Sequence, residues 1–191
     1  MWKGKQFSMD EKAANSSSVT DAEKKERKEK IKSIAKDAVI FLVIFTCILL
    51  VLRFIKFPQI SGSSMNPGLT DGQYVVAITT HDVDVGDIVV VWCPQMNDYL
   101  VKRVIGVAGD TITISKGRLY RNGVEMYEPY LQEQDWNRDP HEHTETIPDG
   151  KIYVLGDNRN ESTDSRTIGL LSVSDVQMKV IATPEWINKF K

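Results

Sequence analysis

The feature that most constrains this fold is a charge-free apolar run at residues 38–52, which a single threonine interrupts. Residues 54, 55 and 57 are also apolar, and Arg53 and Lys56 have alkyl stems long enough to keep their charges in water. The extended run of about 20 residues is long enough for a helix to cross a hydrocarbon core of about 30 Å. The sequence therefore predicts a membrane-spanning helix, assigned to residues 36–56.

Basic residues are unequally distributed around this run and predict its orientation. Only Arg53 and Lys56 follow it closely, whereas seven precede it: Lys24, Lys25, Arg27, Lys28, Lys30, Lys32 and Lys36. The positive-inside bias places the N-terminus in the cytoplasm and residues 57–191 outside, at the cytoplasmic membrane. A cleaved signal peptide is the alternative, but charges occupy its cleavage region and no Ala-x-Ala sequence follows promptly, so a permanent anchor is favoured.

The segments on either side of the helix differ in character. Residues 1–35 are polar and lack an apolar period, which predicts a disordered, basic cytoplasmic tail, although residues 23–30 have mixed charges at helical spacing. After residue 57, β-branched or aromatic runs alternate with turn residues. The expected strands are 74–78, 87–92, 99–107, 111–115, 151–155 and 177–183. Asn122-Gly123 predicts a hairpin over residues 118–126, and residues 128–148 read as a polar, irregular excursion.

The predicted fold class is therefore mainly β, with one β-rich catalytic domain at residues 57–191 behind one transmembrane helix. The net charge of −2 offers no case for binding nucleic acid. Cys47 lies in the apolar run and Cys93 in a polar, strand-rich segment, so we expect no disulfide between them. His141 and His143 fall in a charged loop, which favours solvation over metal binding. We expect no cofactor and no metal ion.

Two positions could carry chemistry. Ser64 lies in a turn of small residues that can present one hydroxyl beside backbone N–H groups, although many such turns are only turns. Lys102 shares a strand face with Leu100 and Val104, and an apolar face would desolvate the ammonium and lower its pKa. A neutral amine can take a proton from a serine. The alternative is a lysine whose charge reaches solvent at the sheet edge.

A third stretch, residues 156–166, follows the expected strand 151–155 and combines opposite charges with hydroxyls. Such a loop is either simply solvated or held in one conformation by charge-assisted hydrogen bonds. Together with the apolar run, these stretches resemble the type I signal peptidase family. The residues that carry the resemblance are Ser64, Met65, Pro67 and Leu69; Gly86 to Val90; Lys102 to Gly106 with Gly109 and Asp110; and Gly156 to Arg159 with Ser162, Asp164, Ser165 and Arg166.

The resemblance extends from the anchor to about residue 171, and the short domain with one N-terminal anchor is similar to the Gram-positive form. It implies a serine-lysine protease that removes signal peptides from exported preproteins after small-x-small sequences. Ser64 is then the nucleophile and Lys102 the general base, with Ser162 hydrogen-bonded to Lys102. Arg103 is expected to pair with Asp157, and Asp164 with Arg166.

The resemblance also implies shallow apolar pockets for small substrate residues, lined by Ile60, Met65, Leu100 and Val101. The sequence departs from the family at two positions. Gly68 stands where threonine is usual, and at Gly62 some members have a serine that helps to bind the oxyanion. The backbone N–H of Ser64 then has a larger part in that role, or the Ser63 hydroxyl substitutes.

Two alternative functions are compatible with parts of this sequence, and other features disfavour both. A self-cleaving regulator with the related serine-lysine β fold is disfavoured by the membrane segment and by the lack of a DNA-binding region. A catalytically inactive, membrane-anchored accessory protein for secretion or pilus assembly is disfavoured by the presence of Ser64, Lys102 and Ser162. The expected partners are preproteins and the lipid bilayer, with no nucleic acid, and the chain is expected to be monomeric.

Overall fold

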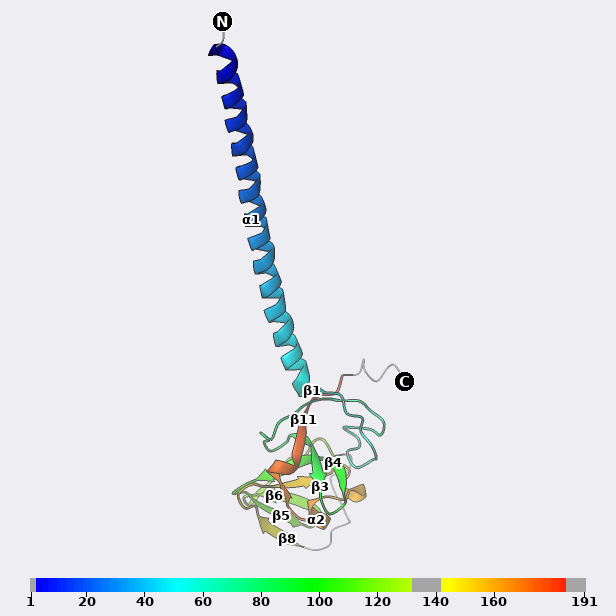
Figure 1. The fold of residues 1–191 in the computed structure, drawn as a ribbon. Helices are drawn as coiled ribbons and strands as arrows, with labels where there is room; N and C mark the ends of the chain where they lie inside the picture. Colours follow the sequence, from blue (N-terminus) through cyan, green and yellow to red (C-terminus); the bar gives the residue numbers. More distant parts are fainter. Residues whose placement is uncertain (1–2, 132–141, 185–191) are drawn as a thin grey trace. The chain divides into compact units, whose positions relative to one another are not determined.

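The computed structural model describes residues 3–131 and 142–184, with side chains in the N-terminal helix described from residue 24 onward. The chain separates into two compact units, Met1–Arg53 and Phe54–Lys191, and each is considered by itself (Figure 1). The first unit is helical. The second contains both β-sheets and the predicted site residues.

The first unit consists of helix α1, which runs over Lys3–Phe54. The helix includes the polar residues expected to form a tail, among them residues 23–30 with their mixed charges at helical spacing. Ion pairs at helical spacing, such as Lys30 with Glu26 at 2.6 Å, are one reason why a polar segment can remain helical. The part Lys24–Phe54 is long and apolar enough to cross a membrane, and none of its most apolar window is buried against protein.

The second unit is mainly β, as predicted, and its larger sheet has seven strands in the order β1-β2-β11-β3-β4-β9-β10. Neighbouring strands pair antiparallel throughout this sheet. Its strands are β1 (Ile55–Lys56), β2 (Val76–Ile78), β3 (Ile88–Cys93), β4 (Asp98–Val107), β9 (Lys151–Leu155), β10 (Leu171–Ser172) and β11 (Val176–Ala182). The central position of β4, between β3 and β9, places Lys102 in the interior of the sheet rather than at its edge.

The smaller sheet has four strands in the order β7-β6-β5-β8. They are β5 (Thr111–Ser115), β6 (Arg118–Arg121), β7 (Val124–Glu125) and β8 (His143–Thr146). The predicted hairpin is confirmed, with φ angles of 54° at Asn122 and 79° at Gly123. The prediction that residues 128–148 are irregular is wrong for residues 143–146. These polar residues form strand β8, which pairs with β5 at the edge of this sheet. His141 and residues 132–140 lie outside the described residues.

Short helical turns complete the second unit: η1 (Arg159–Glu161), α2 (Ser165–Ile168) and η2 (Val173–Asp175). Predicted strands 111–115 and 151–155 match β5 and β9 residue for residue. The expected strand 74–78 is shorter in the structure, since Tyr74 makes only an isolated bridge to Gln59.

Three groups of buried apolar side chains form the core. One group contains Leu100, Val104 and Val154 in the larger sheet, and a second contains Ile112, Ile147 and Tyr153 at the smaller sheet. The third consists of Ile60, Met65, Leu69 and Val75, with Val101 packed against it. Because Ile60 precedes Ser64 and Met65 follows it directly, this third group anchors the turn that contains Ser64 to the domain.

Candidate active site

The Ser64 turn is held by its own backbone and by two buried side chains. Asn66 N–H donates to the Ser63 carbonyl at 3.0 Å, and Leu69 N–H donates to the Met65 carbonyl at 2.9 Å. Before the serine, Gly62 has a φ of 88°, and its N–H donates to Asp71 Oδ1 at 2.8 Å. Met65 and Leu69 are each 1% exposed. The turn is therefore ordered on both sides of Ser64.

Lys102 contacts Ser64 directly. Its Nζ donates to Ser64 Oγ at 2.7 Å and to the Val101 carbonyl at 3.0 Å. The predicted apolar face is present, because Leu100 and Val104 from the same strand belong to one buried group, and Lys102 is 3% exposed. The snorkelling alternative is therefore wrong for this lysine.

The burial of Lys102 alters its acid–base behaviour. Desolvation lowers the pKa of Lys102 from 10.5 to about 8, even though the carboxylates of Asp164 and Asp157 act in the opposite direction. A fraction of the amines is then neutral near pH 7. In that state the hydrogen bond can reverse, so that Ser64 Oγ–H donates to Nζ. This is the arrangement that removes a proton from a hydroxyl.

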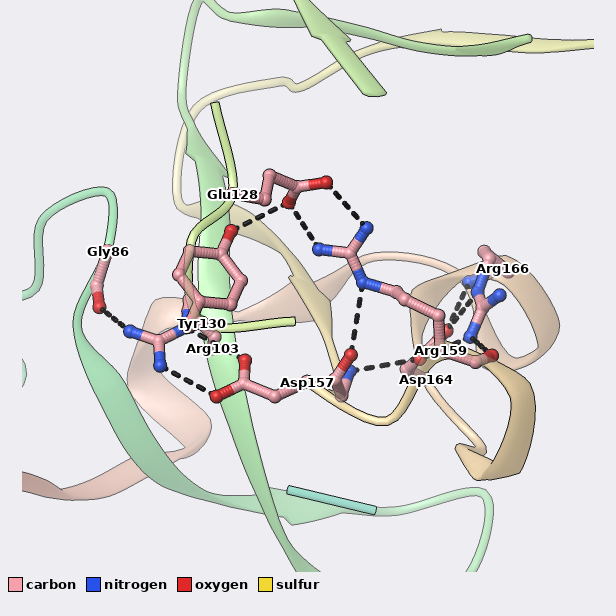
Figure 2. A network of polar contacts seen from close by, with 9 residues as sticks. Gly86, Arg103, Glu128, Tyr130, Asp157, Arg159, Asp164 and Arg166 are labelled. Carbon is pink, nitrogen blue, oxygen red and sulfur yellow. Dashed lines mark hydrogen bonds and ion pairs between the residues drawn. The ribbon is translucent and has the colours of Figure 1, made fainter. Parts of the chain in front are cut away.

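The loop after β9 contacts both the serine turn and strand β4, and Figure 2 shows Asp157 of this loop beside Arg103 of β4. Arg103 Nε donates to Asp157 Oδ1 at 2.8 Å, and its Nη2 donates to Oδ2 at 2.7 Å. Burial opposes the charge of Arg103, but its hydrogen bonds to Asp157 outweigh this and raise the pKa of the guanidinium. Asn158 N–H donates to the Ser64 carbonyl at 3.0 Å. The expected pairing of Arg103 with Asp157 is thus present.

The second expected ion pair organises the loop itself. Arg166 Nε donates to Asp164 Oδ1 at 2.8 Å, and Asp164 Oδ2 accepts from Gly156 N–H at 3.0 Å. Asp164 has no exposed surface. Its carboxylate therefore satisfies a backbone donor that would otherwise be buried without a partner, which accounts for the position of an acidic residue inside the domain.

Ser162 corrects one expectation. Among the residues that the structure describes, none forms a hydrogen bond with its buried Oγ, so the predicted bond to Lys102 is absent. The hydroxyl packs instead against Gly156, where an added Cβ would lie 2.3 Å from Ser162 Oγ and 2.5 Å from the Ser64 carbonyl oxygen. Ser162 therefore lies close to the Ser64 turn. The two hydrogen bonds that Lys102 Nζ donates go instead to Ser64 Oγ and the Val101 carbonyl.

The residues expected to bind substrate do not form one surface. Ile60, Met65 and Val101 meet in the third core group, whereas Leu100 belongs to the core group of the larger sheet. Ile60 is 2% exposed, so it lines no open pocket in this structure. The Ser63 hydroxyl, considered for the oxyanion, donates to Glu161 Oε2 at 3.3 Å.

Sequence reasoning assigned no role to Glu128 and Tyr130, which reach the site from the segment after β7. Tyr130 O–H donates to Glu128 Oε1 at 2.7 Å, and the Arg103 guanidinium lies 4.0 Å from the Tyr130 ring centroid. The same carboxylate is paired with Arg159, a residue of the loop after β9. No local pattern marks this pairing, because 31 positions separate its partners.

A serine hydroxyl lies beside a buried lysine on a β-rich domain, and this arrangement is compatible with hydrolases that activate serine without histidine. Residues 31–183 match the family model described as signal peptidase, peptidase S26. The chain is 36% identical to signal peptidase IB of Staphylococcus aureus strain Mu50 over 176 residues, covering 81% of this chain and 88% of the relative. This chain therefore belongs to the signal peptidase family, peptidase S26, and is a peptide-bond hydrolase.

The chain is also similar to two further proteins. Signal peptidase I of Bacillus licheniformis is 36% identical over 150 residues, covering 70% of this chain and 78% of the relative. A crystal structure of a signal peptidase I from Enterococcus faecalis V583 shares 30% identity, with a TM-score of 0.47. That match covers 53% of this chain and 97% of the solved one.

Proposed function

We propose that this chain is a membrane-bound serine endopeptidase that cleaves signal peptides from exported preproteins with a Ser64-Lys102 dyad. The observation that carries the proposal is the 2.7 Å contact between Lys102 Nζ and Ser64 Oγ. Membership of the signal peptidase family supports the substrate class. The lowered pKa of Lys102, about 8, supports its role as the base.

The reaction follows from the two groups. Neutral Lys102 takes the Ser64 proton while Oγ attacks the scissile carbonyl carbon, and the backbone N–H of Ser64 is the proposed donor to the oxyanion. The Lys102 ammonium then gives its proton to the departing amine, and the signal peptide is left as an ester on Ser64. Lys102 next deprotonates a water molecule, which hydrolyses the ester and restores both groups.

The supporting residues are proposed to hold the Ser64 hydroxyl and the Lys102 amine in their relative positions. Arg103 follows Lys102 in β4 and is fixed on Asp157, while Asp164 and Arg166 order the loop that contacts the Ser64 carbonyl. Ser162 is proposed as a packing neighbour of the Ser64 turn. Val101, which is only partly buried, is the proposed lining of a pocket that admits only small side chains, and the buried Ile60 and Met65 belong to the core group against which it packs.

Helix α1 is proposed as a single-pass anchor in the cytoplasmic membrane. The basic residues before its apolar part favour an N-terminus inside and a catalytic domain on the extracytoplasmic face. Substrates arrive with their apolar signal segments in the same bilayer. Holding enzyme and substrate in one plane raises their effective concentration, so a monomer suffices.

The test is cleavage of a purified model preprotein by the full chain in detergent, with cut sites determined by mass spectrometry. Ser64→Ala and Lys102→Ala are compared with Ser172→Ala and Lys151→Ala. The last two residues are a matched control, since they are a serine and a lysine paired across β10 and β9 of the same sheet. We expect cleavage after a small-x-small sequence by the wild type and both controls, and none by the dyad variants.

Other outcomes would count against the proposal. A silent wild-type chain would favour the inactive accessory protein, and binding of exported proteins should then be measured. Equal cleavage by the wild type and the Ser64→Ala and Lys102→Ala variants would exclude the dyad.

A further inference from the structure

A buried carboxylate lies at the centre of the polar network around the site (Figure 2). Glu128 is 4% exposed and Arg159 is 3% exposed, and the two form a two-contact ion pair. Glu128 Oε1 also accepts the Tyr130 hydroxyl at 2.7 Å. Burying an uncompensated guanidinium is costly, so Arg159 depends on this carboxylate for its place in the domain.

One arm of the network leads to the Ser64 turn. Arg159 Nε donates to the Gly156 carbonyl at 3.1 Å, which fixes the start of the loop after β9. Gly156 approaches the Ser64 carbonyl so closely that a side chain at this position would clash with it. The next two residues continue the contact, since Asn158 N–H donates to the same Ser64 carbonyl. Glu128 is therefore linked to the Ser64 turn through its contact with Arg159 and the contact of Arg159 with Gly156.

The other arm leads to Lys102. The Tyr130 ring lies against the Arg103 guanidinium, at 4.0 Å from Cζ to the ring centroid. Arg103 also donates from Nη1 to the Gly86 carbonyl at 2.8 Å and is paired with Asp157. Because Arg103 directly follows Lys102 in β4, these contacts restrain the backbone that carries the amine.

The two arms start at one carboxylate and end at the two members of the dyad. We propose that Glu128 is a positioning residue for the peptidase reaction: through Arg159 and Tyr130 it keeps Ser64 and Lys102 at contact distance. The inference rests on the proposed dyad. It gives the segment after β7 a role in the reaction, because that segment supplies a buried carboxylate that is paired with Arg159.

The test is Glu128→Gln in the full chain, assayed with a model preprotein in detergent across pH. A small misplacement of reacting groups can cost about 100-fold, so we expect kcat to fall between about 10-fold and 100-fold, with KM changed by less than about twofold. We also expect the acid limb of the kcat profile to move to higher pH. Desolvation is what lowers the pKa of Lys102, while Asp164 and Asp157 act to raise it. If the site is loosened and water reaches Lys102, its pKa should therefore rise.

Glu125→Gln is the matched control. Glu125 lies three positions earlier and pairs with Arg118 on the surface of the smaller sheet, so its loss should leave kcat and the pH profile unchanged. A purely structural role for Glu128 would lower the amount of folded protein but leave the acid limb of the kcat–pH profile in place. Normal kcat per folded molecule, with that limb at its wild-type pH, would therefore overturn the inference.

A second variant covers the case in which Glu128→Gln does not fold. Tyr130→Phe removes one hydrogen bond and keeps the ring against Arg103, and we expect kcat to fall by about fivefold with the same shift of the limb. Unchanged kcat and an unmoved limb would overturn the inference. The result is separate from the proposed function: an inactive wild type defeats the dyad, whereas an active wild type with unaffected variants defeats only the role of Glu128.

Discussion

Lys102 Nζ lies 2.7 Å from Ser64 Oγ, although 38 positions separate the two residues in the chain. The contact forms because β4 is central in the larger sheet and the Ser64 turn is anchored by its own core group. The lysine is 3% exposed, so its charge has lost most of its water. The predictions below follow from that burial and from the loop that surrounds the pair.

The first prediction concerns pH. Lys102 acts only when neutral and its pKa is about 8, so kcat/KM should rise by about tenfold per pH unit below that value and level off above it. Cleavage of a preprotein, measured from pH 5 to pH 10 with separate checks that the enzyme remains folded, gives the profile. Full activity at pH 5 would exclude lysine as the base.

The second prediction concerns stability. The unfolded chain binds a proton at Lys102 up to pH 10.5, whereas the folded chain releases it near 8, so burial of this lysine costs stability at pH 7. Lys102→Met should abolish cleavage yet raise the free energy of unfolding at pH 7 by up to about 3 kcal/mol.

The sign of this linkage gives the control within the same experiment. Between pH 8 and pH 10.5 the wild-type chain gains stability because only its unfolded state still binds the proton. The advantage of Lys102→Met, measured by urea unfolding in detergent, should therefore shrink over that window. A difference that is constant with pH would show that the lysine is not desolvated.

The third prediction compares two glycines beside the site. A Cβ at Gly156 would lie 2.5 Å from the Ser64 carbonyl oxygen, so Gly156→Ala should displace the turn and reduce kcat by about 100-fold. At Gly68 the nearest atom would be Asp157 Oδ2 at 3.4 Å, an ordinary contact. Gly68→Ala should keep activity and stabilise the domain by about 0.4–1 kcal/mol. The check is to measure kcat and thermal unfolding for both variants. Equal effects of the two substitutions would contradict the predicted difference between Gly156 and Gly68.

The fourth prediction concerns the Arg103-Asp157 pair. Arg103→Lys keeps the charge but loses the paired hydrogen bonds through Nε and Nη2, and we expect a loss of about 1.5–3 kcal/mol in unfolding free energy, with lower kcat. Arg118→Lys, in the exposed pair with Glu125, should change stability by less than about 0.5 kcal/mol. Similar losses in both variants, measured by urea unfolding, would show that the geometry of Arg103 is unimportant.

The sequence by itself determined the elements that depend on local patterns. The apolar run predicts a helix, alternating β-branched residues predict β5 and β9 with their observed bounds, and Asn122-Gly123 predicts the hairpin turn. Strand β8 was missed because its polar residues lie at a sheet edge, where pairing with β5 rather than burial orders them. The charged part of α1 lacks an apolar period, so the sequence offers only the mixed charges of residues 23–30 as a sign that the helix extends there.

Only the tertiary structure decided the contacts between distant segments. The sequence motifs single out Ser64 and Lys102. The 2.7 Å distance between Ser64 Oγ and Lys102 Nζ, and the loss of water around Lys102, depend on how β4 packs against the serine turn. The position of Ser162 against Gly156, and of Glu128 on Arg159, follows from the same packing. The Ser64–Lys102 and Glu128–Arg159 contacts join residues tens of positions apart, so no local pattern encodes them. Burial, together with the charges that the fold brings nearby, sets the charge states on which the chemistry depends.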